Sequence, residues 1–304
     1  MKENKMNLEL IIQQADQNKA IFNNDPTEEN KVHLEFAIAG YSLALKNSSD
    51  DKANRYAQRG ISLLRLDKFE EATIDLEESL KINPSQDFVL EEYALALYQL
   101  QRFEEATVSL TKAIELNPNV ANYYLGRGIT KNNLGRYKEA LVDLTKAIEL
   151  NPNNAVVYAN RGYSFNELGR FEEAIVDYTK AIELEPNNAI PYHNRGFAFS
   201  ELERFDETIS DYTKAIELDP TFINSYSHRG ESYRLKGEVN LAQQDYKTVL
   251  ELFSKQESKY YIPTIRAERG LRTLGISQDT TIEQQALEQG KVTQEKLDKI
   301  LGKF

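Results

Sequence analysis

We expect this 304-residue chain to fold as an all-α solenoid, because its sequence repeats at a fixed interval and each repeat holds two helical stretches. Proline recurs at a constant step of 34 residues, at Pro84, Pro118, Pro152, Pro186 and Pro220. The residues before each proline are nearly the same, as in RFEEAIVDYTKAIELEPNN and RFDETISDYTKAIELDPTF. A repeat of this length forms one structural unit that buries its apolar face only against its neighbours.

The repeat at residues 155–188 illustrates the two helices. Tyr158 and Phe165 lie on one face of a first helix, since apolar residues at helical spacing mark a buried stripe. Gly169 supplies the turn, because glycine adopts backbone angles that other residues avoid. The stretch AIVDYTKAI then carries the apolar face of a second helix, and Pro186 ends it because proline cannot continue a helix.

Six repeats of equal length follow one another from Ala53. They span residues 53–86, 87–120, 121–154, 155–188, 189–222 and 223–256. Before them, residues 1–52 keep a weaker form of the pattern, and we interpret them as a degenerate repeat that caps the array. After them, we predict a capping helix over 257–275 and a helical tail over 276–304.

The tail allows two interpretations. Leu297, Ile300, Leu301 and Phe304 fall at the spacing of one helix face, and Gly290 separates them from an earlier short helix. The tail is either a helical hairpin that packs on the last repeat, or an interaction element. In the second case it docks in the chain's own groove or on a second copy.

The repeats resemble the tetratricopeptide repeat family over residues 53–256. That family has aromatic, small and proline residues at set positions, and counting Ala53 as position 1 aligns this chain with them. The matching residues of the fourth repeat are Tyr158, Gly162, Phe165, Ala174, Tyr178, Ala181 and Pro186. The resemblance implies antiparallel helix pairs that coil into a right-handed superhelix with a concave groove.

One departure from the family is systematic. Position 7 carries arginine instead of leucine in five repeats, and position 23 carries aspartate in the same five. The residues are Arg59 and Asp75, Arg127 and Asp143, Arg161 and Asp177, Arg195 and Asp211, Arg229 and Asp245. In the second repeat both positions change together, to Tyr93 and Ser109. We therefore predict a structural Arg–Asp pair that joins the two helices of each of these repeats.

The composition excludes several classes of protein. A formal net charge of −11 argues against nucleic-acid binding, which depends on Lys and Arg contacts to phosphate. The absence of cysteine excludes a disulfide framework and cysteine-ligated metal sites. No apolar stretch has the length of a signal peptide, and none approaches the roughly 18–20 residues that span a bilayer. We expect a cytoplasmic protein without membrane insertion.

No catalytic constellation is evident. His33, His193 and His228 have no neighbours at metal-ligand spacing. The Gly-Arg-Gly at 126–128 lies inside a helical pattern and lacks the strand and the third glycine of a dinucleotide-binding loop. We predict no catalytic residue, no metal and no cofactor, and we expect that the chain is not an enzyme.

The resemblance implies that a ligand lies along the concave face, on the first helix of each repeat. Position 6 there carries Asn160, Asn194 and His228, which look like part of the asparagine ladder by which some relatives clamp a peptide backbone. An amide offers both a donor and an acceptor, so it satisfies an extended backbone of any sequence. Under the simpler alternative, these are polar groove residues without that role. The other groove residues predicted are Tyr163, Asn166, Glu167, Phe197, Glu201, Glu231 and Arg234.

These observations favour a scaffold or adaptor that binds a partner's peptide segment in the groove. Aromatic residues beside glutamates suit a segment that mixes apolar and basic side chains. The basic set that grips a C-terminal carboxylate in chaperone-binding relatives is not assembled here. One alternative is self-association through the tail or the ends of the array. Another is a regulatory or recruiting subunit of an enzyme in a different chain, and the acidity disfavours an RNA binder.

Overall fold

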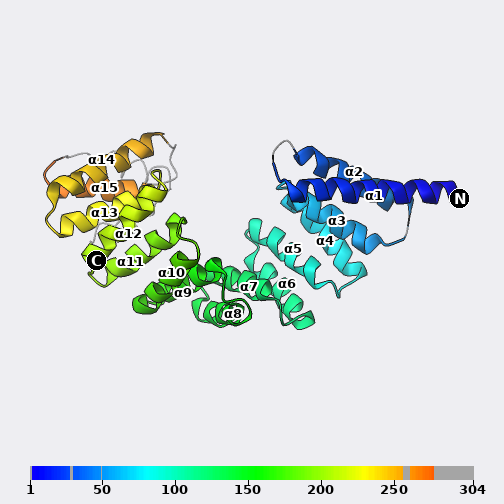
Figure 1. The fold of residues 1–304 in the computed structure, drawn as a ribbon, viewed down its shortest axis with the longest axis horizontal. Helices are drawn as coiled ribbons and strands as arrows, with labels where there is room; N and C mark the ends of the chain where they lie inside the picture. The colour runs from blue at the N-terminus through cyan, green and yellow to red at the C-terminus, as the bar shows by residue number, and fades with distance from the viewer. Residues whose placement is uncertain (1, 28–29, 49, 256–260, 277–304) are drawn as a thin grey trace. The chain divides into compact units, whose positions relative to one another are not determined.

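The computed structural model describes residues 2–27, 30–48, 50–255 and 261–276, and within them the regular secondary structure is α-helix throughout (Figure 1). The helices are α1 Lys2–Asn24, α2 Lys31–Asn47, α3 Lys52–Leu64, α4 Phe69–Ile82, α5 Asp87–Gln99, α6 Phe103–Leu116, α7 Ala121–Asn133, α8 Tyr137–Leu150, α9 Ala155–Glu167, α10 Phe171–Leu184, α11 Ala189–Glu201, α12 Phe205–Leu218, α13 Ile223–Leu235, α14 Val239–Lys255 and α15 Tyr261–Thr273. None of the helices in these ranges is both long and apolar enough to cross a bilayer.

Each 34-residue repeat folds as one helix pair. From α3 to α13 the first helix of a pair has 13 residues, and from α4 to α12 the second helix has 14. The last of the second helices, α14, runs on to 17 residues. It does so because Ser254 stands where the other repeats have the proline that ends the helix.

The chain divides into two compact units, residues 1–152 and residues 153–304, and each is described by itself. Within a unit, the first helix of a repeat contacts the first helix of the next one, whereas the second helices approach one another less closely. We call the first helices inner helices: α3, α5 and α7 in the first unit, α9, α11 and α13 in the second. The second helices are outer helices: α4, α6 and α8, then α10, α12 and α14.

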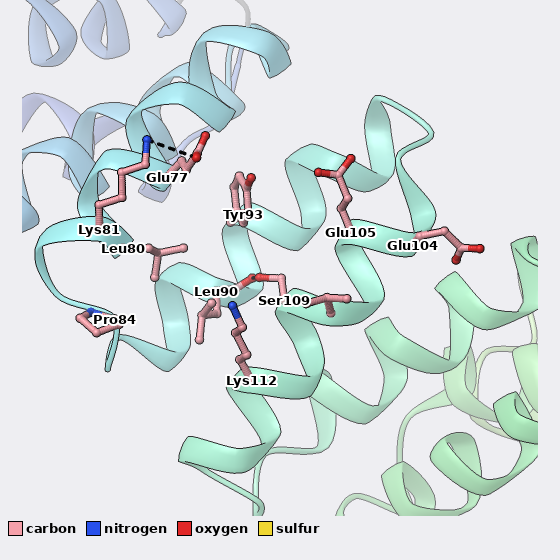
Figure 2. A pocket seen from close by; sticks show the side chains of 11 residues that line it. Glu77, Leu80, Lys81, Pro84, Leu90, Tyr93, Glu104, Glu105, Ser109 and Lys112 are labelled. Carbon is pink, nitrogen blue, oxygen red and sulfur yellow. Dashed lines mark hydrogen bonds and ion pairs between the residues drawn. The ribbon is translucent and has the colours of Figure 1, made fainter.

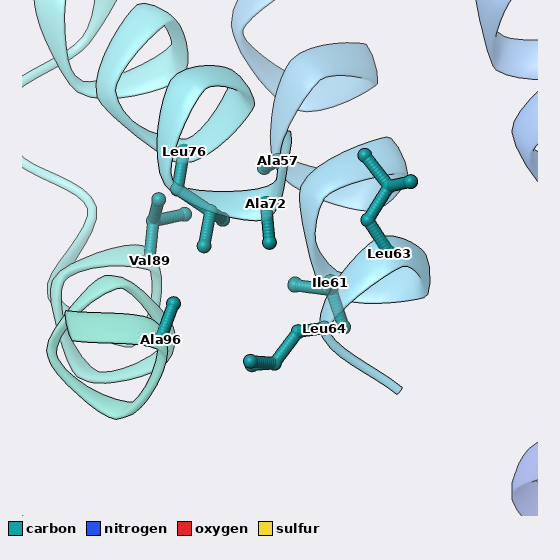
Figure 3. Close-up of a cluster of buried hydrophobic side chains, with 8 residues drawn as sticks. All are labelled: Ala57, Ile61, Leu63, Leu64, Ala72, Leu76, Val89 and Ala96. Carbon is teal, nitrogen blue, oxygen red and sulfur yellow. The ribbon is translucent and has the colours of Figure 1, made fainter. Parts of the chain in front are cut away.

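A small residue on the inner helix lets the outer helix come close. In the first unit, Ala57, Ala72 and Leu76 belong to a buried cluster of α3, α4 and α5 (Figure 3). In the second unit, a Cβ added at Gly162 would lie 2.9 Å from the ring of Tyr178, which is fully buried. Such a distance is below van der Waals contact, so only glycine allows this approach without a shift of the ring.

The five arginines at position 7 each contact the aspartate predicted to pair with them. Arg195 donates from Nε to Asp211 Oδ2 at 2.7 Å, and from Nη2 to Asp211 Oδ1 at 2.8 Å. A third donor, Nη1, lies 2.9 Å from Thr179 Oγ1 on the preceding outer helix. The guanidinium also stacks over Tyr192 and Phe199, with 5.8 and 5.9 Å to the ring centroids. One side chain therefore connects α11, α12 and α10.

The same bidentate geometry recurs in the other four repeats. The pairs are Arg59–Asp75, Arg127–Asp143, Arg161–Asp177 and Arg229–Asp245. The aspartate side chains are 3–7% exposed. A carboxylate so deeply buried needs its partner, because an unpaired buried charge costs far more than a surface ion pair gains.

The ends of the described chain are helical. Residues 1–52, where we predict a degenerate repeat, contain the helix pair α1 and α2, held by Ala15, Ala37 and Tyr41. The capping helix expected over 257–275 corresponds to α15, which packs against α13 and α14. The amphipathic segment at Leu297–Phe304 lies outside the described residues.

The Arg195–Asp211 pair predicts a large coupling energy. We expect Arg195→Leu and Asp211→Ala each to lower the free energy of unfolding by about 3 kcal/mol, because each leaves a buried charge unpaired. The double variant should cost clearly less than the sum. Urea unfolding of the four proteins measures the coupling, and additive costs would contradict it. As a control on the same helix, Lys214→Ala breaks an exposed ion pair with Glu217 and should cost about 0.5 kcal/mol or less.

Candidate binding surfaces on the inner helices

An apolar pocket of about 260 Å³ opens on the inner helices of the first unit, between α5 and α7. Its lining residues are Glu91, Ala94, Leu95, Tyr98, Leu110, Asn122, Gly126, Ile129 and Thr130. Eight of these nine residues belong to the inner helices α5 and α7, and Leu110 comes from the outer helix α6. The pocket therefore lies on the surface where we expect a ligand.

Gly126 creates this pocket. It occupies position 6, where the other repeats carry the side chains of Gln58, Glu92, Asn160, Asn194 and His228. A Cβ added there would lie 3.3 Å from Leu110 Cδ1, a tight contact, so the missing side chain also lets Leu110 of α6 approach this surface of α7. This pocket was not predicted from the sequence. The available signal was the one glycine in a row of polar residues.

The edge of the pocket is acidic. Burial, followed by the carboxylates of Glu92 and Asp87, raises the pKa of Glu91 above its usual range. Leu95 is 39% exposed at the same edge. An apolar cavity beside a negative potential suits an apolar side chain with a basic neighbour.

In the second unit, the structure brings together Asn166 and Asn194 from the predicted groove set. Asn166 Nδ2 lies 3.2 Å from the Tyr178 hydroxyl and 3.4 Å from the backbone oxygen of Asn194. Its Oδ1 is buried and has no hydrogen-bond partner among the described residues. Asn160 Nδ2 donates to the backbone oxygen of Val156, one turn back on its own helix, at 2.8 Å. The amide of Asn160 is thus partly committed to α9.

His228 is enclosed by aromatic rings. It stacks on Tyr212 with 5.6 Å between centroids, and meets His193 and Phe197 edge to face at 5.4 and 6.3 Å. Its Nδ1 lies 2.9 Å from the backbone oxygen of Asn224, which accepts a hydrogen bond. Burial, then Arg266 and His193, lowers the pKa of His228 well below its usual range. The ring is therefore a neutral part of an aromatic cluster, and its Nδ1 is already bonded.

The remaining predicted residues separate into two groups. Tyr163, Glu167 and Glu201 are exposed, and Phe197 is half-buried. Glu231 and Arg234 instead pair with each other, at 2.6 and 3.0 Å between their oxygen and nitrogen atoms.

The Glu231–Arg234 pair lies where α15 packs on α13. Tyr246 donates its hydroxyl to Glu231 at 2.8 Å. Arg266 and Arg269 of α15 line a small cavity of about 110 Å³ together with the pair. These two predicted groove residues are therefore engaged with the end of the array, beside the capping helix.

Comparison with known families decides the classification. Models described as tetratricopeptide repeat match residues 53–86, 89–120, 121–154, 144–176 and 189–222, and a model described as TPR repeat matches 162–203. Together they cover more than half of the chain. This chain belongs to the tetratricopeptide repeat family. Proteins of this family are generally non-catalytic scaffolds, and the repeats support a role in protein–protein interaction.

Solved tetratricopeptide repeat structures share the fold. A crystal structure of MamA is 26% identical, covers 54% of this chain and 95% of its own, and superposes with a TM-score of 0.51. A tetratricopeptide repeat protein from Parabacteroides merdae ATCC 43184 is 18% identical, with 88% and 98% coverage and a TM-score of 0.63. YrrB, described as having an unusual peptide-binding site, is 20% identical, with 64% and 97% coverage and a TM-score of 0.52. No curated protein matched the sequence.

The aromatic cluster predicts a loss of stability in acid. His193 stacks on Phe222 at 4.6 Å, and its Nδ1 lies 2.9 Å from Ser225 Oγ. Burial, then the charge of Arg266, lowers the pKa of His193 to about 4. The unfolded chain binds this proton at about pH 6.5, so stability is complete above that pH and declines as the pH falls towards 4.

Two measurements check this prediction. The ring proton on Cε1 of His193, followed by NMR, should titrate near pH 4, and titration near pH 6.5 would contradict it. In His193→Gln, the free energy of unfolding should depend less steeply on pH between 6.5 and 4. His228 retains part of the slope, because the pKa of its ring is lowered in the same direction.

Proposed function

We propose that this tetratricopeptide repeat protein is a non-catalytic scaffold or adaptor that binds a peptide segment of a partner protein on its inner helices. The observation that carries the proposal is the apolar pocket at Gly126, between α5 and α7. A cavity of this size on a repeat surface accepts one large apolar side chain, such as leucine or phenylalanine. Anchors of this kind supply most of the affinity in a protein–protein interface.

The charge beside the pocket indicates the composition of the segment. Glu91 is half-buried next to Asp87 and Glu92, and the whole chain is acidic. A basic residue close to the apolar anchor would relieve this repulsion and would also steer association. The favoured ligand is therefore a segment that mixes apolar and basic residues.

The second unit supports backbone recognition. Asn166 Oδ1 is a buried acceptor without a partner among the described atoms, and Asn194 contacts the same amide. An unsatisfied buried acceptor is costly, so a backbone N–H of a bound segment would stabilise it. Asn160 and Asn194 keep the ladder role proposed for them, with Asn166 beside them. Tyr163 and Phe197 would supply apolar contact.

Filling the pocket tests this function. Gly126→Leu should place a side chain in the cavity and reduce the amount of partner captured from native lysate by about tenfold, because the anchor is excluded. The melting temperature should change little, because the higher helix propensity of leucine offsets the small shift of Leu110 that a Cβ at this position requires. The matched control is Val142→Leu, which enlarges an exposed side chain on the outer helix α8.

The readout is mass spectrometry of the captured proteins. A protein lost with Gly126→Leu and kept with Val142→Leu identifies the partner, and an enzyme among such proteins would define a recruiting role. Asn160→Ala combined with Asn194→Ala tests the second unit in the same way. Identical capture by wild type and Gly126→Leu would exclude the pocket as the binding site.

A further inference from the structure

Four repeats place their own arginine between their outer helix and the second helix of the repeat before: the arginines are Arg59, Arg127, Arg195 and Arg229. Arg127 lies over the ring of Tyr124 at 5.9 Å and binds Asp143 of its own outer helix at 2.6 and 2.9 Å. It also donates to Thr111 of the preceding outer helix at 3.1 Å. The arrangement thus combines a tyrosine at position 4, an arginine at position 7, an aspartate at position 23 and a threonine at position 25 of the repeat before.

All four residues of this arrangement differ around the second repeat, three of them in that repeat and one in the repeat before. Leu90 stands in place of the tyrosine, Tyr93 in place of the arginine and Ser109 in place of the aspartate. Glu77 of α4 stands in place of the threonine. Ser109 Oγ donates to the backbone oxygen of Leu90 at 2.8 Å, so it is satisfied locally. An aromatic ring therefore stands at the position of the arginine and a carboxylate at the position of the threonine. The guanidinium is missing.

The consequence is an open pocket of about 470 Å³ between α4, α5 and α6 (Figure 2). We call it the outer pocket. Leu80, Leu90 and Val108 give it apolar walls, and Val108 is 55% exposed.

Carboxylates flank the aromatic ring of the outer pocket. Figure 2 shows Tyr93 between Glu77 of α4 and Glu105 of α6, with Glu104, at the start of α6, farther from the ring. Burial, then the negative charge of Glu77, raises the pKa of the Tyr93 hydroxyl above its usual value. Glu105 acts in the same direction and Arg102 opposes it. Three of the five charged side chains that line the pocket are carboxylates.

These carboxylates are available to a ligand because their present partners lie at the surface. Glu77 is 51% exposed and meets Lys81 at 3.2 Å, and Lys81 is closer to Glu78, at 2.8 Å. Glu105 is 54% exposed and pairs with Arg102. Exposed ion pairs of this kind contribute little in water and exchange readily for a better partner.

We propose that the outer pocket binds an arginine side chain of a basic partner protein. The guanidinium stacks on Tyr93 and donates to Glu77 and Glu105, whereas each internal arginine lies over a tyrosine and donates to both oxygens of one aspartate. The aliphatic stem packs against Leu80 and Val108. Arginine fits better than lysine, because a planar guanidinium stacks on a ring and binds carboxylates through several donors at once.

The charge of the chain favours a partner over a second copy. With a formal net charge of −11, two copies repel each other, whereas a basic partner is attracted. The outer pocket also differs from the surface in the proposed function. It lies between α4, α5 and α6, and none of its lining residues lines the cavity at Gly126.

A pair of peptides tests the proposal on the full chain. The probes are acetyl-Leu-Arg-Leu-amide and its citrulline counterpart, which keeps the shape of arginine and loses the charge. We expect the arginine peptide to shift the methyl NMR signals of Leu80, Leu90 and Val108. The citrulline peptide should bind about tenfold more weakly, because charge-assisted hydrogen bonds are lost.

Two variants and one control locate the interaction. Tyr93→Arg with Ser109→Asp rebuilds the internal pair and should abolish the shifts, because the pocket then holds its own guanidinium. Glu77→Gln should weaken the arginine peptide about tenfold with the fold intact. Glu149→Gln removes a similarly exposed carboxylate from the outer helix α8 and should have no effect.

Three outcomes would overturn the proposal. The first is equal affinity for the arginine and citrulline peptides, which would make the pocket a purely apolar site. The second is binding of the arginine peptide that persists in the rebuilt variant and in Glu77→Gln. The third is a concentration-dependent mass of the wild type that disappears in the rebuilt variant, which would assign the outer pocket to a second copy.

Discussion

The buried Arg–Asp pair is the constraint on which the rest of the fold depends. A repeat has no core of its own, so its two helices and the preceding outer helix must be fixed by contacts that recur in each unit. Arg195 makes such a contact with Asp211, Thr179 and two aromatic rings at once. Because the aspartates are almost fully buried, any shift between the inner and outer helix of a repeat would leave a buried charge unpaired. The pair therefore fixes the alignment of the two helices and also holds them together.

Binding capacity arises where this regular pattern is interrupted. On the inner helices, Gly126 removes the side chain that the other repeats carry at position 6, and a cavity opens above Leu110. On the outer helices, the second repeat omits the internal arginine, and a larger pocket forms beside Tyr93. Both pockets belong to the first unit. In the second unit, position 6 carries a polar or aromatic side chain in each repeat, and positions 7 and 23 carry arginine and aspartate in each.

The repeat pattern predicts the helices because the position of a residue within the 34-residue unit determines whether its side chain is buried. The pattern also predicts contacts, because two positions that change in the same repeat are expected to touch. Tyr93 and Ser109 depart from the pattern in the same repeat, which pointed to contact between positions 7 and 23 in the others. The environment of His228 could not be predicted in this way, since its neighbours Tyr212 and His193 come from other helices. Glu231 and Arg234 lie on the inner helix α13 as expected, but they line a cavity together with Arg266 and Arg269 of α15. The sequence of α15 does not follow the repeat, so the pattern could not predict this contact.

Tyr246 holds α15 against the last repeat. Its ring lies between Gly230 on one edge and Gly270 on the other, and a Cβ at either glycine would collide with it. The place that the inner helix of one more repeat would take is therefore already filled by α15. A seventh full repeat could be added only by a sequence that brings its own glycine to that ring and displaces α15. Among the described residues, α15 thus takes the place of a further inner helix and covers the end of the last repeat.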